Sequence, residues 1–306
     1  MHCVFHLHSC CSHSFVLIFL QPTVVLPYTC HRSGMISLLL LTLLTSPRVD
    51  ASLTSEGDNS ITELLSNQMD FIMPENRVIG GNETEPNAWP WTVQLVYKNV
   101  FQCGGSLINE SFVVTAAHCI GIRLPQHYIV LSGGHRRMSG RPHKVIKLFV
   151  HPLYNPFFYL YDIALLKIAP EVKLGESAQV IALPKMPPLD FEMCTIAGWG
   201  LTETGRGSRL RQARVPIVPF LECIRPIKYW GRIFPGTMLC AGYPKGGIDS
   251  CKGDSGGPLM CERDGQWELQ GVVSWGEGCG EPGYPGIYAR IFPVIPYLNL
   301  MMQLNQ

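Results

Sequence analysis

A serine flanked by glycines stands near the end of this 306-residue chain, in the stretch "DSCKGDSGGPL" at 249–259. Glycines let the backbone approach a bound carbonyl group closely, and backbone N–H groups can then point at an oxygen that gains negative charge. A serine hydroxyl is a poor nucleophile until a base removes its proton. The stretch therefore indicates an acyl-transfer site at Ser255 that needs a base from elsewhere in the chain.

A candidate base and a candidate acid lie in apolar runs upstream of Ser255. His118 lies in the apolar run "VVTAAHC", and Asp162 opens the run "DIALLKI". Taken singly, a structural core histidine and a strand cap are the ordinary interpretations of the two residues. Together with Ser255 they form the set that nucleophilic catalysis requires, because a carboxylate orients the imidazole and stabilises its charged form.

The order of the three residues decides between two folds. "GDSGG" also fits the nucleophile elbow of the α/β-hydrolases, in which the serine precedes the acid and the histidine. No histidine follows Ser255 in this chain, so that fold is excluded. The order His118, Asp162, Ser255 is the one found in chymotrypsin-like proteases.

Short apolar runs, rich in β-branched residues and separated by Gly, Pro and Asn, follow one another from Val78 onward. Their lengths predict an antiparallel all-β domain. One helix is expected at the end, in "VIPYLNLMMQLNQ", with Pro296 in its first turn. The stretch 182–192 is interpreted as a linker between two β lobes.

Composition points to an oxidising compartment. Eight of the twelve cysteines lie after residue 100 without any close Cys-x-x-Cys pair, which favours a disulfide framework over zinc sites. The net charge of +1 gives no indication of nucleic-acid binding.

The N-terminal region predicts export. An apolar run in 35–51 has the length of a signal peptide, with Val49 and Ala51 at the positions that precede a cleavage site. We therefore expect residues 1–51 to be a leader whose signal starts at Met35; one long leader from Met1 and a signal-anchor remain alternatives. Residues 52–77 are then an acidic pro-segment. The His/Cys-rich start of the chain precedes the signal and is not interpreted as a metal site.

Residues 78–306 closely resemble a complete trypsin/chymotrypsin-family serine protease domain. The motifs that carry the resemblance are "VIGG", "CGGSLI", "VVTAAHC", "DIALLK", "AGWG", "GDSGGP", "VVSWG" and "PGIY". The resemblance implies a chymotrypsin-like all-β fold of two six-stranded antiparallel β-barrels with a short C-terminal helix. It also implies four disulfides: Cys103–Cys119, Cys194–Cys261, Cys223–Cys240 and Cys251–Cys279.

The resemblance assigns roles to individual residues. It makes His118, Asp162 and Ser255 catalytic, and it forms the oxyanion hole from the N–H groups of Gly253 and Ser255. The substrate-binding residues that it implies are Asp249, Ser250, Ser274, Gly276 and Gly286. A carboxylate at Asp249, deep in a slot with glycine walls, predicts cleavage after Arg or Lys.

Activation is expected to depend on the bond between Arg77 and Val78. In the family, the amine freed by this cut pairs with the carboxylate beside the nucleophile, which is Asp254 in this chain. Sequons at Asn82 and Asn109 predict surface glycosylation.

The sequence thus predicts a secreted serine endopeptidase that is made as a zymogen and acts extracellularly or in secretory granules. Tethering to a membrane is the less favoured location. The alternative function is a catalytically idle family member that acts as a secreted binding or signalling protein. We expect a monomer without a cofactor or a metal ion. A calcium site is not expected in the first barrel, because no Asp or Glu lies between Glu110 and Asp162. The expected partners are peptide substrates with Arg or Lys at the cleaved bond and serine protease inhibitors.

One further partner is expected at residues 121–149, a stretch that carries cationic residues and no Asp or Glu. A basic loop there would bind sulfated glycans or acidic segments. Its cationic residues are Arg123, Arg136, Arg137, Arg141, Lys144 and Lys147.

Overall fold

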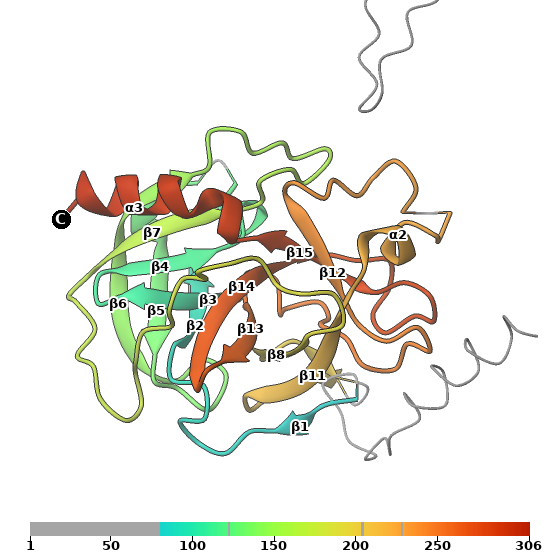
Figure 1. The fold of residues 1–306 in the computed structure, drawn as a ribbon. Coiled ribbons are helices and arrows are strands. Elements are labelled where there is room, and N and C mark those ends of the chain that lie inside the picture. Colours follow the sequence, from blue (N-terminus) through green and yellow to red (C-terminus); the bar gives the residue numbers. More distant parts are fainter. Residues whose placement is uncertain (1–79, 122, 203–204, 228) are drawn as a thin grey trace, which may run out of the picture. The chain divides into compact units, whose positions relative to one another are not determined.

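The computed structural model describes residues 80–306 apart from 122, 203–204 and 228 (Figure 1). The predictions on the leader, the pro-segment, Arg77 and Val78 lie outside the described residues.

Six antiparallel strands close the first barrel, in the order β2-β3-β4-β7-β6-β5. Apolar residues occur at every second position or in unbroken runs along these strands, and their side chains fill the interior of the barrel. Val93, Leu107 and Leu165 are fully buried. The strands are β2 (Thr92–Tyr97), β3 (Val100–Asn109), β4 (Phe112–Thr115), β5 (Tyr128–Ser132), β6 (Arg141–Val150) and β7 (Ala164–Ala169).

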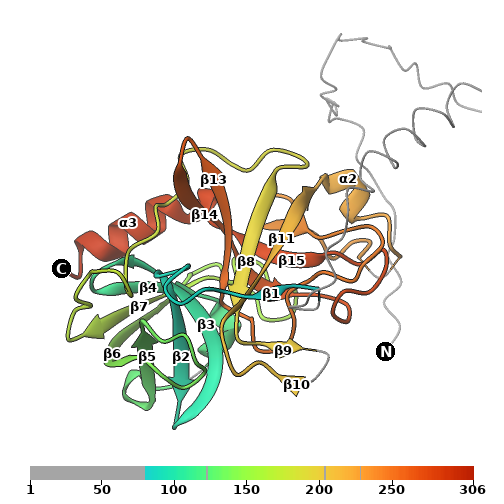
Figure 2. The ribbon, with the colours of Figure 1, turned by 90° about the horizontal axis from the view of Figure 1, so that it is seen from below.

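The second barrel is also six-stranded and antiparallel. Its order is β11-β12-β15-β14-β13-β8, and pairing of β8 with β11 closes it. A short strand, β1 (Asn82–Glu83), adds to β11, and β9 (Leu201–Thr202) pairs with β10 (Gly205–Arg206) (Figure 2). The barrel strands are β8 (Met193–Gly198), β11 (Arg211–Val218), β12 (Met238–Ala241), β13 (Pro258–Arg263), β14 (Gln266–Trp275) and β15 (Gly286–Arg290). The prediction of two six-stranded barrels is confirmed.

The helices among the described residues are few and short. The C-terminal helix α3 (Ile295–Gln303) carries Pro296 in its first turn, as predicted. The others are η1 (Ala117–Cys119), η2 (Pro125–His127), α2 (Phe220–Cys223) and η3 (Phe292–Val294). Within the described part of the chain, no helix has the length and apolar character needed to cross a membrane.

The four disulfides pair as the resemblance implied. Two of them fix parts of the candidate site. Cys103–Cys119 joins β3 to η1, which contains His118, and Cys251–Cys279 joins the loop before Ser255 to the segment before β15.

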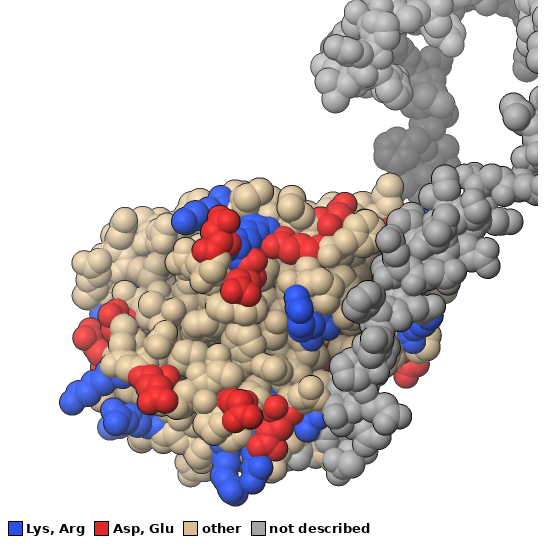
Figure 3. Space-filling view, turned by 60° about the horizontal axis from the view of Figure 1, so that its bottom comes forward, with Lys and Arg blue, Asp and Glu red and all other residues tan. Residues whose placement is uncertain are grey.

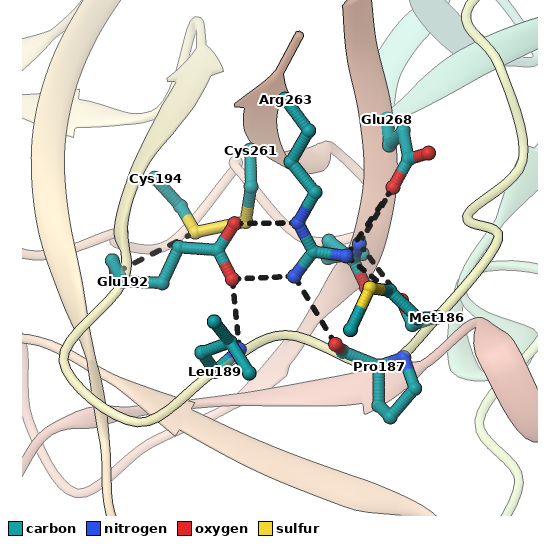
Figure 4. Close-up of polar contacts among 9 residues, drawn as sticks. Met186, Pro187, Leu189, Glu192, Cys194, Cys261, Arg263 and Glu268 are labelled. Carbon is teal, nitrogen blue, oxygen red and sulfur yellow. Dashed lines mark hydrogen bonds and ion pairs between the residues drawn. A yellow bond between two sulfur atoms is a disulfide. The ribbon is translucent and has the colours of Figure 1, made fainter.

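The stretch 182–192 connects the two barrels, as predicted, and Arg263 of β13 fastens it (Figure 4). The guanidinium donates two hydrogen bonds to Glu192, of 2.8 and 2.5 Å, and one each to the carbonyl oxygens of Met186 and Pro187. Glu268 lies 3.5 Å away on the other side. Burial alone would raise the pKa of Glu192, but hydrogen bonds from Arg263 and the Leu189 N–H hold it below its ordinary 4.5.

Replacing Arg263 by alanine is expected to destabilise the domain by about 3 kcal/mol, because two largely buried carboxylates lose their cation. Since the folded-state pKa of Glu192 is lowered, the stabilisation is present above pH ~4.5 and disappears as the pH falls through the folded-state value. Urea unfolding of wild type and Arg263→Ala at pH 7 and pH 3 measures both effects.

The matched control is Arg209→Ala, which removes a cation 2.8 Å from Glu83 where both side chains are more than 40% exposed. A loss below about 1 kcal/mol is expected there. Equal losses for the two variants would contradict the structural role of Arg263.

Candidate active site

Asp162 holds the imidazole of His118. The carboxylate is fully buried just before β7, and its Oδ2 lies 2.7 Å from Nδ1 of His118. Its Oδ1 accepts the backbone N–H of His118 at 2.8 Å, and the hydroxyl of Ser274 donates to Oδ2 at 2.5 Å. Because Nδ1 donates to the carboxylate, Nε2 of the neutral ring is left as the acceptor.

Strand register explains why these two residues meet. Thr115, the last residue of β4, pairs with Ala164, the first residue of β7. His118 follows Thr115 by three residues within η1, and Asp162 precedes Ala164 by two, so both stand at the same end of neighbouring strands. The Cys103–Cys119 disulfide fixes the turn.

The loop that carries Ser255 lies against both barrels. The carbonyl of Ser255 accepts a hydrogen bond from Gly104 of β3 at 2.8 Å, and Gly256 donates to Val273 of β14 at 2.9 Å. A Cβ on Gly256 would lie 2.2 Å from the hydroxyl oxygen of Thr115, so only glycine fits this position. The serine, supplied by the second barrel, is therefore fixed beside β3 and the end of β4 on one side and beside β14 on the other.

Asp254, next to the serine, is a buried carboxylate with tight surroundings. Its oxygens accept hydrogen bonds from Gly200 at 2.8 Å and Cys251 at 2.9 Å. Cβ atoms on Gly198 and Gly200 would lie within 2.4 Å of the carboxylate oxygens, so the "AGWG" glycines make room for it. Burial raises the pKa of Asp254 to about 6, which favours its pairing with a cation. Gly253, at φ +102°, adopts a conformation that other residues avoid.

A second buried carboxylate, Asp249, is 4% exposed. Its oxygens accept hydrogen bonds from the N–H groups of Ser250 at 2.8 Å and Gly280 at 3.0 Å. Burial, only partly offset by these bonds, raises its pKa to about 7. A buried carboxylate of this kind favours a cationic ligand, because pairing with the cation offsets the free-energy cost of burying an unpaired charge.

One of the two glycines predicted to line the pocket, Gly286, lies beside this carboxylate, and the other, Gly276, lies near Gly286. A Cβ on Gly286 would stand 2.5 Å from Oδ1 of Asp249, and one on Gly276 would stand 4.0 Å from the Cα of Gly286. Two tyrosines that sequence reasoning missed complete the surroundings. The hydroxyl of Tyr288 is 3.3 Å from that of Ser250, and the hydroxyl of Tyr229 bonds to the carbonyl of Pro285.

An aromatic side chain next to His118 was also missed. The ring of Tyr159 lies 5.8 Å from the imidazole and 6.3 Å from the ring of Trp275. Arg232 covers Trp275, with its guanidinium carbon 4.6 Å from the ring centroid. The only available signal was the aromatic run "FFYLY" directly before Asp162.

The described residues do not favour a metal site. The one group of metal-ligand type among them is Cys103, His118 and Cys119, and both cysteines are consumed by their disulfide. The loop 133–140 contains no Asp or Glu, and Gln94 holds it in place. Its buried amide donates to the carbonyls of Arg136 and Ser139 and accepts from the N–H of Met138.

The cationic stretch predicted as a basic loop extends along β5, β6 and the loop between them. Arg136 and Arg141 are exposed at the loop, whereas Arg137 lies over the ring of Phe101, 4.4 Å from its centroid. Lys147 donates to Asn305 near the C-terminus. On the face shown in Figure 3, cationic and anionic side chains are intermingled. Both sequon asparagines, Asn82 and Asn109, are exposed, and their glycosylation stays a prediction.

Comparisons with known proteins agree with this geometry. A family model described as Trypsin matches residues 78–298. Human serine protease 56 is 42% identical over 225 residues, which cover 70% of this chain and 37% of that protein. Rat transmembrane protease serine 9 is 38% identical over 229 residues, covering 73% of this chain and 22% of that protein. The matched region thus spans well under half of either relative. With its two barrels, four disulfides and His–Asp pair beside the serine loop, the chain belongs to the trypsin family of serine proteases.

Proposed function

We propose that the protein is an endopeptidase that hydrolyses peptide bonds after Arg and Lys. The observation that carries the proposal is the buried carboxylate of Asp249 directly beside Gly286, in the domain that also holds His118 against Asp162. A cationic side chain of a substrate pairs with Asp249, and this places the next carbonyl group at Ser255.

The hydrogen bonds between His118 and Asp162 support the following reaction. The Oγ of Ser255 attacks the substrate carbonyl while Nε2 of His118 takes its proton, and Asp162 stabilises the imidazolium that forms. The N–H groups of Gly253 and Ser255 bind the oxyanion. The imidazolium then protonates the leaving amine, and a water molecule releases the acyl group by the same steps. The hydrogen bond from Ser274 to Asp162 holds the carboxylate in place.

Cleavage rates on three peptide amides that differ only at the residue before the amide test the specificity. After activation, the amide with Arg is expected to be cleaved far faster than those with Phe or Asp. Faster cleavage of the Phe amide would contradict the assignment of Asp249 to the pocket floor.

We further propose that a cut at Arg77 activates the protein. The new amine of Val78 carries a positive charge near neutral pH and pairs with Asp254, whose pKa burial raises to about 6. The pair fixes the backbone from Gly253 to Ser255, so that its N–H groups face the oxyanion. Secretion is proposed along with activation, and the four disulfides support it.

Replacing Arg77 by glutamine is expected to yield a folded and secreted protein without peptidase activity, since no protease of basic specificity can free Val78. The measurement compares cleavage of an Arg amide by Arg77→Gln and by wild type, each after limited treatment with immobilised trypsin. Arg77→Lys is the matched control and should activate normally. Full activity of uncut Arg77→Gln would contradict the switch.

A further inference from the structure

A histidine ring lies between two tyrosine rings next to the segment that contains Asp162. The imidazole of His151, just after β6, stacks on the ring of Tyr161, with the ring centroids 4.5 Å apart and the planes 5° from parallel. The ring of Tyr297, in α3, meets the same imidazole edge-on at 4.7 Å. We call His151, Tyr161 and Tyr297 the ring stack. Only 8% of His151 is exposed.

The ring stack adjoins the turn that carries Asp162. Tyr161 directly precedes Asp162, and its carbonyl accepts the N–H of Ile163 at 2.7 Å, which closes a three-residue turn with Asp162 at its centre. The carbonyl of Ile163 in turn accepts the backbone N–H of His151 at 3.0 Å. His151 therefore contacts both ends of the turn, one end through its ring and the other through its backbone.

The backbone of Tyr161 adopts a conformation that bulky residues seldom adopt. Its φ is +48°, in the left-handed region, where a side chain of this size is uncommon. Such a conformation persists only where contacts in the folded protein favour it over other backbone conformations. The stacking of the Tyr161 ring on His151 supplies a contact of this kind.

The position of His151 is itself fixed by neighbouring groups. Its Nδ1 accepts the N–H of Leu153 at 3.3 Å. Burial lowers the pKa of His151 below its ordinary 6.5, so the ring is neutral near pH 7 and Nδ1 keeps the lone pair that this hydrogen bond needs. The hydroxyl of Tyr297 donates to the carbonyl of Val150 at 3.1 Å, and Figure 1 shows α3 lying along the first barrel. The C-terminal helix thus supports the end of β6 and the ring that follows it.

The placement of Asp162 matters for the proposed reaction. Its carboxylate lies 2.7 Å from Nδ1 of His118, where it stabilises the imidazolium. The backbone N–H of His118 and the hydroxyl of Ser274 hold the carboxylate oxygens, whereas the turn holds the backbone from which the side chain projects. A misplacement of about 1 Å in a catalytic site can lower the rate by about 100-fold.

We propose that His151 and Tyr161 are positioning residues for the hydrolysis. Their stacked rings fix the turn around Asp162, and Tyr297 of α3 holds the stack in place. The C-terminal helix thereby contributes to the geometry of the pair formed by His118 and Asp162. This inference rests on the proposed function, in which Asp162 orients His118.

The test measures kcat and KM for the small Arg amide after activation with immobilised trypsin. His151→Ala and Tyr161→Gly each remove one ring of the stack, and glycine tolerates the φ of +48° at position 161. Each change is expected to lower kcat by about 10-fold, with KM within about twofold of wild type because the pocket is unchanged.

Two further variants separate the ring of His151 from its hydrogen bond. His151→Phe keeps a flat ring without the Nδ1 acceptor, and its kcat should lie within about twofold of wild type, since aromatic pairs gain from ring packing. His151→Asn keeps a polar acceptor without the ring, and its kcat should be as low as that of His151→Ala. Thermal unfolding shows whether each variant is folded.

The pH profile of kcat gives a readout that a loss of stability alone would not move. The carboxylate of Asp162 stabilises the protonated imidazole, so a less firmly held carboxylate lets His118 lose its proton at lower pH. In His151→Ala, the midpoint of the acid limb of kcat is therefore expected about 0.5–1 pH unit below that of wild type. Saturating substrate keeps Asp249 paired with a cation, so the ionisation of Asp249 does not contribute to this limb.

His143→Ala is the matched control. His143 is a histidine of the same barrel, 4% exposed, and lies within hydrogen-bond distance of the Ser132 hydroxyl, at 2.9 Å, and of the Pro170 carbonyl, at 2.6 Å. Its replacement should lower the thermal unfolding temperature, because two buried hydrogen bonds are lost. It should leave kcat and its pH profile unchanged.

The outcomes separate the two proposals. No cleavage of the Arg amide by activated wild type would overturn the proposed function, and with it this inference. Normal cleavage by wild type, with kcat and its pH profile unchanged in His151→Ala and Tyr161→Gly, would overturn the inference alone. Equal losses of kcat for His143→Ala and His151→Ala, or a His151→Phe variant as slow as His151→Ala, would also overturn it.

Discussion

Replacing Ser255 by alanine in the activated protein is expected to lower kcat on an Arg amide by a factor on the order of 10⁶. The oxygen that forms the acyl bond is lost, and only the oxyanion hole and substrate binding remain to accelerate the reaction. His118→Ala is expected to lower kcat by about the same factor. The double variant should lower kcat only slightly further, because the two residues act as one unit. Burst and steady-state kinetics with the amide measure these effects.

Ser208→Ala is the matched control for Ser255→Ala, since it removes an exposed serine hydroxyl remote in the chain from the nucleophile loop. Its kcat should equal that of wild type. Thermal unfolding of all variants shows whether the fold is preserved. Residual activity of Ser255→Ala within tenfold of wild type would refute the role of Ser255 as the nucleophile.

Replacing Asp249 by serine is expected to lower kcat/KM on Arg substrates by about 3–5 kcal/mol, or about 10²- to 10⁴-fold, because a buried cation then lacks its counter-charge. For substrates with an apolar residue at the cleaved bond, kcat/KM should change little in Asp249→Ser. The measurement is kcat/KM on the matched Arg and Phe amides. Glu277→Gln is the control, since this side chain pairs with Arg232 beside the pocket.

The pH dependence of KM adds a second test of the pocket. Burial raises the pKa of Asp249 to about 7, so its carboxyl is protonated below that pH and must ionise before a cation binds well. The KM for the Arg amide is therefore expected to rise as the pH falls below about 7. This rise should be absent in Asp249→Ser; an identical pH profile in the two proteins would show that another group controls binding.

The sequence predicted the strands well where buried side chains produce a recognisable pattern of apolar residues. The run "WTVQLVY" contains β2, and "LQGVVSW" lies within β14. β6 extends beyond its apolar part to Arg141, because its register with Ser132 of β5 continues the pairing into exposed, polar residues. Periodicity reports which side chains are buried and gives no measure of how far a hairpin continues beyond them.

The candidate site was predicted in its chemistry and less completely in its surroundings. His118, Asp162 and Asp249 stand in recognisable motifs, and the resemblance selected one disulfide pattern from the 105 pairings that eight cysteines allow. Tyr159 and Tyr229, which both contact Trp275, come from separate loops. No short-range spacing in the sequence connects them, because only the folded arrangement of the chain brings the loops together. The same holds for Gln94, whose partners lie more than 40 residues away.

The most direct test of the central claim is the identification, by mass spectrometry, of every new C-terminus that the activated protein generates in a mixture of unfolded proteins. The account predicts that nearly all of these C-termini are Arg or Lys, and that neither uncut Arg77→Gln nor trypsin-treated Ser255→Ala generates them. Products that end mainly in other residues, or the same products from Ser255→Ala, would contradict it.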